Sequence, residues 1–482
     1  MASSLARSSA RGGLHMLTGQ GARLIVQMVG LVLLARLLGP QEYGLFAMAW
    51  TVMAFAAVFQ DAGLSTAVIR ARTVSRDQHT NLWWVNAAVG AALTVIVAAA
   101  SPLVGMFFGS PDVAPVVACL GLTFLVSGTT AQHNAIATRD MRFALLASTG
   151  VIGAAVGLAV SIWLAVAGAG VWSLVAQMLV GALVSGLLLV VRIGWLPGLP
   201  QRGVPLKEFF DFGIPLLASR AVQYFSQNFD LALIGRFFGA VPLGYYSRSI
   251  QLVRMPLNQV RGPISNVALS SLAKNQDDDS RLVQFAVRGQ MLLCYPIVLL
   301  GFGIAAAAEP IVLIMMGADW APATDYIRLA AVGEALNTMA MTAGWIYTAK
   351  GASTSLLKYT VVSVAVRVVL YSIGAFALGP IGVAGGFALA PILLWPLSLV
   401  WAGKVTGVPT AELLTNSYRI FAVCSVVTVL TALVGALIHA HMVLELLAMV
   451  TVQLLGAGAA ALVPAVRRDY RLSWDALSRA WR

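Results

Sequence analysis

Residues 144–192 read ALLASTGVIGAAVGLAVSIWLAVAGAGVWSLVAQMLVGALVSGLLLVVR, and Arg192 is the first charged residue in this stretch. Two apolar runs, 144–166 and 170–192, are separated only by a short Ala-Gly-Ala sequence. A helix needs about 20 predominantly apolar residues to cross a hydrocarbon layer of ~30 Å. The stretch therefore predicts two consecutive transmembrane helices.

The same pattern recurs along the whole chain of 482 residues, of which 59% are hydrophobic and 10% charged. Soluble domains carry roughly 25% charged residues. The sequence thus predicts an all-α polytopic membrane protein of about 14 transmembrane helices. The expected spans are 13–38, 43–68, 81–107, 114–137, 144–166, 170–192, 213–238, 241–268, 283–308, 323–348, 355–378, 381–403, 419–439 and 442–465.

The basic residues indicate the orientation of these spans. Most of the 31 Lys and Arg residues fall in alternate connections, on the side that also holds both termini, whereas the opposite connections carry acidic residues. Cytoplasmic connections are enriched in Lys and Arg. We therefore expect a multi-pass protein of the bacterial inner membrane with both termini in the cytoplasm. The same distribution explains the net charge of +12 without a nucleic-acid partner.

An internal repeat with an offset of 200 residues organises the chain. Arg-Leu-Leu-Gly at 36–39 precedes Gly-Leu-Phe at 44–46, and Arg-Phe-Phe-Gly at 236–239 precedes Gly-Tyr-Tyr at 244–246. Two parallel six-helix repeats, followed by two additional helices, fit this pattern. The expected divisions are an N-terminal lobe at 1–193, a cytoplasmic linker at 194–212 in which a helix could lie at the interface, a C-terminal lobe at 213–404, helices 13 and 14 at 405–466, and a basic cytoplasmic tail at 467–482.

Polar side chains within the expected spans are the candidate functional residues. Arginine at the centre of a membrane helix costs about 2.5–3.5 kcal/mol, so such residues face a cavity or a partner. At ~100° per residue, these side chains group on one face of their helices, and a water-filled cavity between the repeats would explain the grouping. A single arginine could equally form a structural ion pair or reach the interface. The candidates are Arg23, Arg220, Arg248, Arg254, Gln20, Gln27, Gln223, Gln227 and Asn258, with Asp230 and Glu334 as buried acids.

Other chemistries find little support. Cys119, Cys294 and Cys424 are far apart in apolar segments, so no zinc or disulfide pattern exists. No catalytic motif is present, and we expect neither an enzyme nor a cofactor or metal. The glycines of Gly153-x-x-x-Gly157 are typical of closely packed membrane helices.

Two segments carry a family resemblance. ARLLGPQEYGLF at 35–46 resembles the first-repeat signature of Wzx/WzxC-type polysaccharide exporters, and GRFFGAVPLGYYSR at 235–248 resembles the second-repeat counterpart. The resemblance implies a member of the multidrug/oligosaccharidyl-lipid/polysaccharide (MOP) exporter superfamily. Such proteins flip undecaprenyl-pyrophosphate-linked oligosaccharides to the periplasmic leaflet by alternating access.

The leading hypothesis is therefore a flippase for a lipid-linked oligosaccharide, with the arginines holding pyrophosphate and the amides holding sugar hydroxyls. Coupling to H⁺ or Na⁺ would use Asp230 or Glu334, and polysaccharide polymerase machinery is a candidate partner. One alternative is a cation or drug antiporter of the same superfamily. Another, from a different class, is a membrane polysaccharide polymerase or ligase.

Overall fold

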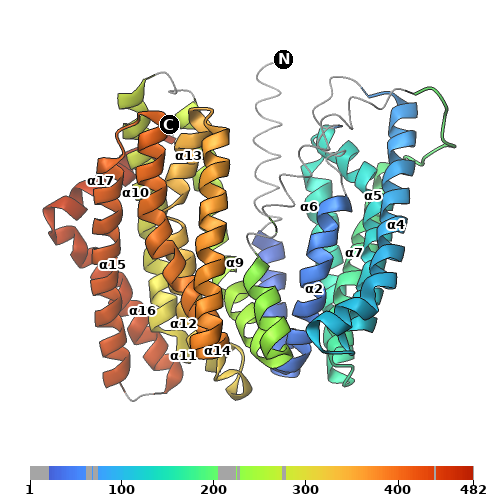
Figure 1. The fold of residues 1–482 in the computed structure, drawn as a ribbon, viewed down its shortest axis with the longest axis horizontal. Coiled ribbons are helices and arrows are strands. Elements are labelled where there is room, and N and C mark those ends of the chain that lie inside the picture. Colours follow the sequence, from blue (N-terminus) through green and yellow to red (C-terminus); the bar gives the residue numbers. More distant parts are fainter. Residues whose placement is uncertain are drawn as a thin grey trace. The chain divides into compact units, whose positions relative to one another are not determined.

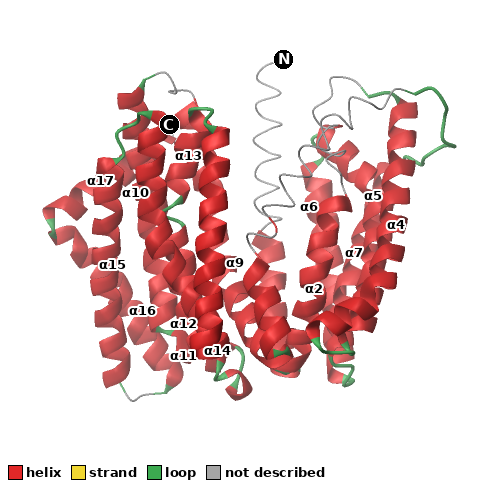
Figure 2. Cartoon of the chain, viewed as in Figure 1, coloured by secondary structure: helices red, strands yellow, loops and turns green. Residues whose placement is uncertain are grey.

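The computed structural model describes residues 21–60, 68, 74–204, 224, 228–273, 278–438 and 441–480. Within these residues, helices are the only regular secondary structure, and short loops join them (Figure 2). The chain divides into two compact units, Met1–Gly244 and Tyr245–Arg482. The predicted all-α class is confirmed, whereas the limits of the lobes and of the linker at 194–212 stay predictions.

The first unit contains a helix at 21–37 and five longer helices that follow the expected spans closely (Figure 1). α4 begins five residues before the span predicted at 81–107. Its start is set by a capping box, in which the Ser75 hydroxyl accepts from the Gln78 backbone N–H and the Gln78 side chain accepts from the Ser75 N–H. The helices are α2 (Pro40–Gln60), α4 (Arg76–Phe108), α5 (Val113–Arg139), α6 (Phe143–Val166) and α7 (Val171–Ile193).

α9 (Ala240–Ala273) begins in the first unit and continues into the second. It runs through Pro256 and Pro263 as one helix. The second unit adds α10 (Asp279–Ala306), α11 (Ala308–Met315), α12 (Ala323–Asn337), α13 (Met341–Ala349), α14 (Ser353–Thr406), α15 (Ala411–Leu437), α16 (Met442–Ala459) and α17 (Pro464–Ala480), with 3₁₀ turns η1 (Ala318–Trp320) and η2 (Ala460–Leu462).

Three expected spans of the second unit need comment. The single span predicted at 323–348 is interrupted, because α12 ends at Asn337 and α13 starts at Met341. The spans predicted at 355–378 and 381–403 correspond to the two helical parts of α14, which are separated by the non-helical residue Gly379 (φ 66°, ψ −145°). A positive φ of this kind is a conformation that glycine adopts without steric cost. The kink therefore marks the turn between two membrane passes.

Nine helices of the described part are long and apolar enough to cross a membrane. α9 is not among them because it carries several arginines, and α12 and α13 are individually short. The expected first and seventh spans lie partly outside the described residues. A polytopic membrane protein is confirmed, and the number fourteen stays a prediction.

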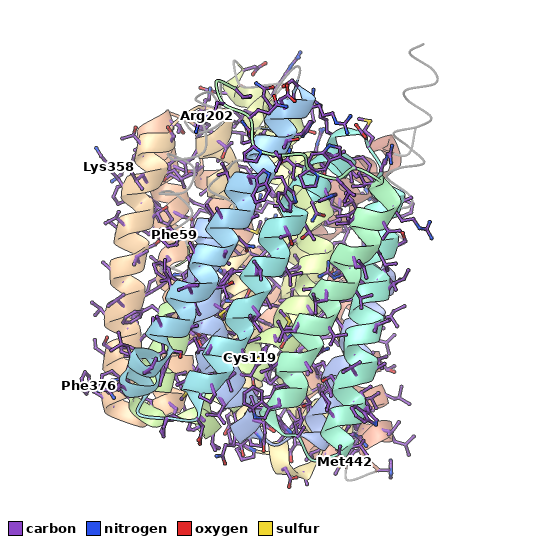
Figure 3. The ribbon with its side chains drawn as sticks, turned by 90° about the vertical axis from the view of Figure 1, so that its right-hand side faces the viewer. Phe59, Cys119, Arg202, Lys358, Phe376 and Met442 are labelled. Atoms are coloured by element: carbon purple, nitrogen blue, oxygen red, sulfur yellow. The ribbon has the colours of Figure 1, made fainter. Side chains whose placement is uncertain are left out.

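Large apolar side chains cover the outward faces of the helices, as a lipid environment requires. Phe376 on α14 is 91% exposed. Figure 3 shows Phe376 and Lys358 near opposite ends of the same helix, with Phe376 at the molecular surface. Trp163 on α6 and Leu187 on α7 are also exposed. In water such a surface would drive aggregation, but in a bilayer these side chains meet acyl chains.

The predicted packing role of the α6 glycines is confirmed. A Cβ atom at Gly153 would lie 2.6 Å from the Gly181 carbonyl oxygen of α7, and one at Gly157 would lie 2.5 Å from that of Gln177. No real Cβ fits at such distances, so the two backbones approach as closely as they do because both positions are glycine.

The two copies of the repeat signature pack against each other reciprocally within the first unit. A Cβ atom at Gly44 would overlap the Ala240 backbone, and one at Gly244 would overlap the Pro40 backbone. Pro40 and Ala240 are themselves 200 residues apart. Equivalent positions therefore exchange equivalent contacts, which is the local geometry of a two-fold axis and agrees with the repeat found in the sequence.

We predict that Gly157→Leu destabilises the protein, because the new side chain must push α6 away from the α7 backbone. The melting temperature in detergent should fall by several degrees, with reduced recovery of monodisperse protein. Gly150→Leu is the matched control, since a Cβ atom at this position of the same helix has no neighbour within 4 Å. Equal losses in the two variants would contradict this account of the packing.

Candidate functional site

A polar face runs along α9. The Arg248 guanidinium donates to the Gln251 side-chain oxygen, three residues further along the helix. Arg261 Nη1 lies 3.4 Å from Asn258 Oδ1. Arg254 occupies the same face between these pairs, since residues three, four and seven apart lie on one side of a helix. The face predicted from the sequence is therefore a chain of neighbouring polar groups.

Glu334 of α12 holds two arginines of this face. Its side chain is 2% exposed; Arg254 Nε lies 2.5 Å from Oε1, and Arg261 Nη1 lies 2.9 Å from Oε2. A carboxylate at membrane depth requires such partners, because isolated buried charge costs several kcal/mol. Each oxygen of Glu334 thus accepts from a different guanidinium.

The break after α12 adds contacts to the same place. Glu334 lies in the last turn of α12, where main-chain carbonyls lose their helical partners. Arg261 Nη2 and the Thr338 hydroxyl both donate to the Glu334 main-chain oxygen, and Arg261 Nε donates to Thr338 Oγ1 at 2.9 Å. Cations also suit the negative end of a helix dipole. Arg261 is therefore a structural cation that ties α9 to the end of α12.

Arg254 differs from Arg261 in its accessibility. The Arg254 side chain is 36% exposed, whereas that of Arg261 is 14% exposed. The Arg254 guanidinium also lies 6.0 Å from the centre of the Phe387 ring, a favourable position for a cation. Nearby, Arg367 Nη2 donates to Asn337 Oδ1 at 2.9 Å. In the described contacts of this cluster, three arginines accompany one carboxylate, so these contacts carry more positive than negative charge.

The other predicted residues are distributed as follows. In the first unit, Arg23 and Gln27 are exposed one helical turn apart on the helix at 21–37, and Asp230 is buried in the helix at 228–238. In the second unit lie Arg248, Arg254, Asn258 and Glu334. Gln20, Arg220, Gln223 and Gln227 lie outside the described residues. The structure brings Arg254 together with Glu334, and the remaining assignments stay predictions.

The binding set predicted from the sequence omits Arg261, Thr338 and Asn337. The seven-residue spacing of Arg254 and Arg261 places both on one face, but nothing in the sequence shows that they share a carboxylate. A second buried pair is also absent from that set: Arg419 of α15 binds Asp469 of α17 through two nitrogens, at 2.7 and 2.8 Å. The amphipathic pattern of α17, with Val466, Asp469 and Ser473 on one side, is the available signal.

Comparisons with known proteins agree with this architecture. A family profile described as "Polysaccharide biosynthesis protein" matches residues 33–325. The lipopolysaccharide biosynthesis protein WzxC of Escherichia coli (strain K12) is 26% identical over 386 residues, which cover 77% of this chain and 77% of that protein. The succinoglycan biosynthesis transport protein ExoT of Rhizobium meliloti (strain 1021) is 26% identical over 316 residues, which cover 65% of this chain and 63% of that protein.

A solved structure shares the fold. The lipid II flippase MurJ, in an inward closed conformation, superimposes with a TM-score of 0.73. The alignment covers 92% of this chain and 98% of that chain at 14% sequence identity. At this identity the likeness concerns the arrangement of helices.

We predict that Glu334→Ala is strongly destabilising, because it leaves Arg254 and Arg261 without their shared carboxylate. Removing one partner of a buried ion pair costs about 3–5 kcal/mol. Asp325→Ala is the control on the same helix: Asp325 forms an exposed ion pair with Arg328 at 2.9 Å, and such pairs contribute about 0–1 kcal/mol. Thermal unfolding in detergent micelles measures both, and a loss of similar size for Asp325→Ala would refute the special role of Glu334.

Proposed function

Because the chain belongs to the polysaccharide biosynthesis protein family, we propose that it is a flippase that carries a lipid-linked oligosaccharide across the bacterial inner membrane. The observation that carries this proposal is the Arg254 cluster. A partly exposed guanidinium at the depth of a predicted membrane span, in a group with more cations than acids, suits a phosphate-bearing substrate. The resemblance of segments 35–46 and 235–248 to Wzx-type exporters agrees with the family match.

The substrate in this proposal is an oligosaccharide linked to undecaprenyl pyrophosphate. Arginine binds phosphate oxygens in a bidentate manner, with strong charge-assisted hydrogen bonds. Arg254 is the group that we expect to bind the pyrophosphate directly, since its side chain is more exposed than that of Arg261, although both bind Glu334. Arg23, Arg220 and Arg248 complete the proposed cationic set, and Gln20, Gln27, Gln223, Gln227 and Asn258 are the proposed partners of sugar hydroxyls.

The names of the relatives support this assignment. The Escherichia coli relative is named for lipopolysaccharide biosynthesis and the Rhizobium meliloti relative for succinoglycan transport.

Transport by alternating access requires no catalytic residue, and we propose that the chain forms and breaks no glycosidic bond. Orientation follows the basic residues: both termini are proposed to be cytoplasmic, which reporter fusions to either end would test.

A cation or drug antiporter is the main alternative within the same fold. Organic cations are bound by acidic groups, whereas the only acid in the described contacts of the α9 cluster is already held by two arginines. An accumulation assay with cationic dyes separates the two functions, because only an antiporter would lower dye accumulation.

We predict that Arg254→Gln lowers transport about 10- to 100-fold, as expected for the loss of charge-assisted hydrogen bonds of about 1.5–3 kcal/mol. The measurement is leaflet-specific labelling of lipid-linked sugars in a deletion strain that carries the variant. Arg254→Lys should retain part of the activity, because it keeps the charge but not the bidentate geometry. Arg328→Gln, which removes an exposed arginine on α12, is the control. Full transport by folded Arg254→Gln would refute the role of Arg254.

The ion that drives transport is a separate question. Asp230 is 2% exposed, and buried acids in membrane helices often bind protons or sodium ions. We predict that Asp230→Asn makes transport in inverted vesicles insensitive to an imposed H⁺ or Na⁺ gradient. If the variant responds to the gradients as the unaltered protein does, coupling does not pass through Asp230.

A further inference from the structure

A cavity of about 300 Å³ lies where α10, α15 and α17 meet in the second unit. Three expected membrane boundaries coincide there, since the predicted spans begin at 283 and 419 and end at 465. Val287 of α10, Thr415 of α15 and Ala465 of α17 line the cavity. The cavity is therefore at the depth where phospholipid headgroups meet the hydrocarbon layer.

A buried ion pair forms the floor of the cavity. Asp469 is 2% exposed and accepts from Arg419 Nε at 2.8 Å, from Arg419 Nη2 at 2.7 Å and from the Tyr295 hydroxyl at 2.8 Å. These contacts hold α17 against α10 and α15. The opposite charges of Arg419 and Asp469 cancel, so the floor is polar and neutral overall.

Asn416 supplies a buried donor that no described residue uses. Its side chain is 3% exposed and lines the cavity, and its Oδ1 accepts from Arg419 Nη2 at 2.6 Å. Its Nδ2 has no hydrogen-bond partner among the described residues. An unsatisfied buried amide donor costs about 1–3 kcal/mol, and an acceptor bound in the cavity would remove that cost.

The rim carries one charge of each sign. Arg468 of α17 and Glu412 of α15 line the cavity, are exposed, and form no ion pair with any described residue. Thr415 also lines the cavity, and its hydroxyl donates to the Ala411 main-chain oxygen at 3.0 Å. A ligand that complements this rim has both an anionic oxygen group and a cationic group.

We propose that this cavity binds the headgroup of a phosphatidylethanolamine-type lipid. Arg468 and the Asn416 amide donate to the phosphate, and the Glu412 carboxylate accepts from the primary ammonium. Pockets between membrane helices near the surface are known binding places for lipid headgroups. Exposed Leu462 and Val463, immediately before α17, provide apolar surface for the acyl chains, which favours a lipid over a soluble ligand.

The test uses the full-length protein, freed of lipid in a maltoside detergent, with thermal unfolding and native mass spectrometry as readouts. Phosphatidylethanolamine should raise the melting temperature and remain bound more than phosphatidylglycerol at the same mole fraction. Glu412→Gln and Arg468→Gln should each abolish this preference, with little change in the melting temperature of the lipid-free protein because both residues are exposed.

Arg467→Gln and Glu445→Gln are matched controls that remove the same charges outside the cavity. Arg467 donates to the Ala461 carbonyl oxygen at 3.1 Å, and Glu445 lies in the first turn of α16. Both controls should keep the preference for phosphatidylethanolamine. Equal effects of phosphatidylglycerol, unchanged lipid binding in both rim variants, or equal stabilisation by soluble O-phosphoethanolamine at the same headgroup concentration would each overturn the proposal.

Discussion

The ion pairs of Glu334 with Arg254 and Arg261 show the constraint on which this structure depends. Hydrocarbon offers no water to solvate charge, so any ionic group carried into it must find its partners inside the protein. Each carboxylate oxygen of Glu334 accepts from a different guanidinium group, and both oxygens of Asp469 accept from Arg419, with the Tyr295 hydroxyl as a further donor. In both places the carboxylate is the most deeply buried member and the arginine keeps some exposure. The acids hold the arginines in position, and the Arg254 side chain keeps the largest exposed fraction of the three, 36%.

The interruption between α12 and α13 follows from the same constraint. A helix that ends at membrane depth leaves main-chain carbonyls without partners, which lipid cannot satisfy. Here Arg261 and Thr338 donate to the Glu334 carbonyl oxygen. One arginine therefore serves a side-chain carboxylate and a helix end together. This combination explains why Arg261 is less exposed than Arg254 and why we assign it a structural rather than a binding role.

The sequence predicted the membrane class, most helix positions and the polar face of α9, because each depends on local periodicity alone. It did not predict the end of α12, since residues 337–341 (Asn-Thr-Met-Ala-Met) contain neither glycine nor proline. Nor did it pair Arg254 and Arg261 with Glu334, which is more than 70 residues away. Asp469 is preceded by two arginines in a basic tail, so its burial against Arg419 becomes visible only once α17 packs on α15. Pairings between distant helices depend on tertiary packing, and local patterns carry little information about them.

The repeat signature shows how a sequence pattern can report a tertiary contact after all. Gly44 and Gly244 each pack against the backbone of the residue that begins the other copy's helix, Ala240 and Pro40. Because the contact is between backbone atoms, it requires that Gly44 and Gly244 have no side chain, and it does not depend on the residues that follow them. Those residues are Leu-Phe in one copy and Tyr-Tyr in the other. A symmetric contact thus requires glycine at the equivalent position of both copies, while the neighbouring side chains can diverge. This requirement is the physical reason why the 200-residue repeat can be recognised in a sequence that is otherwise mostly apolar.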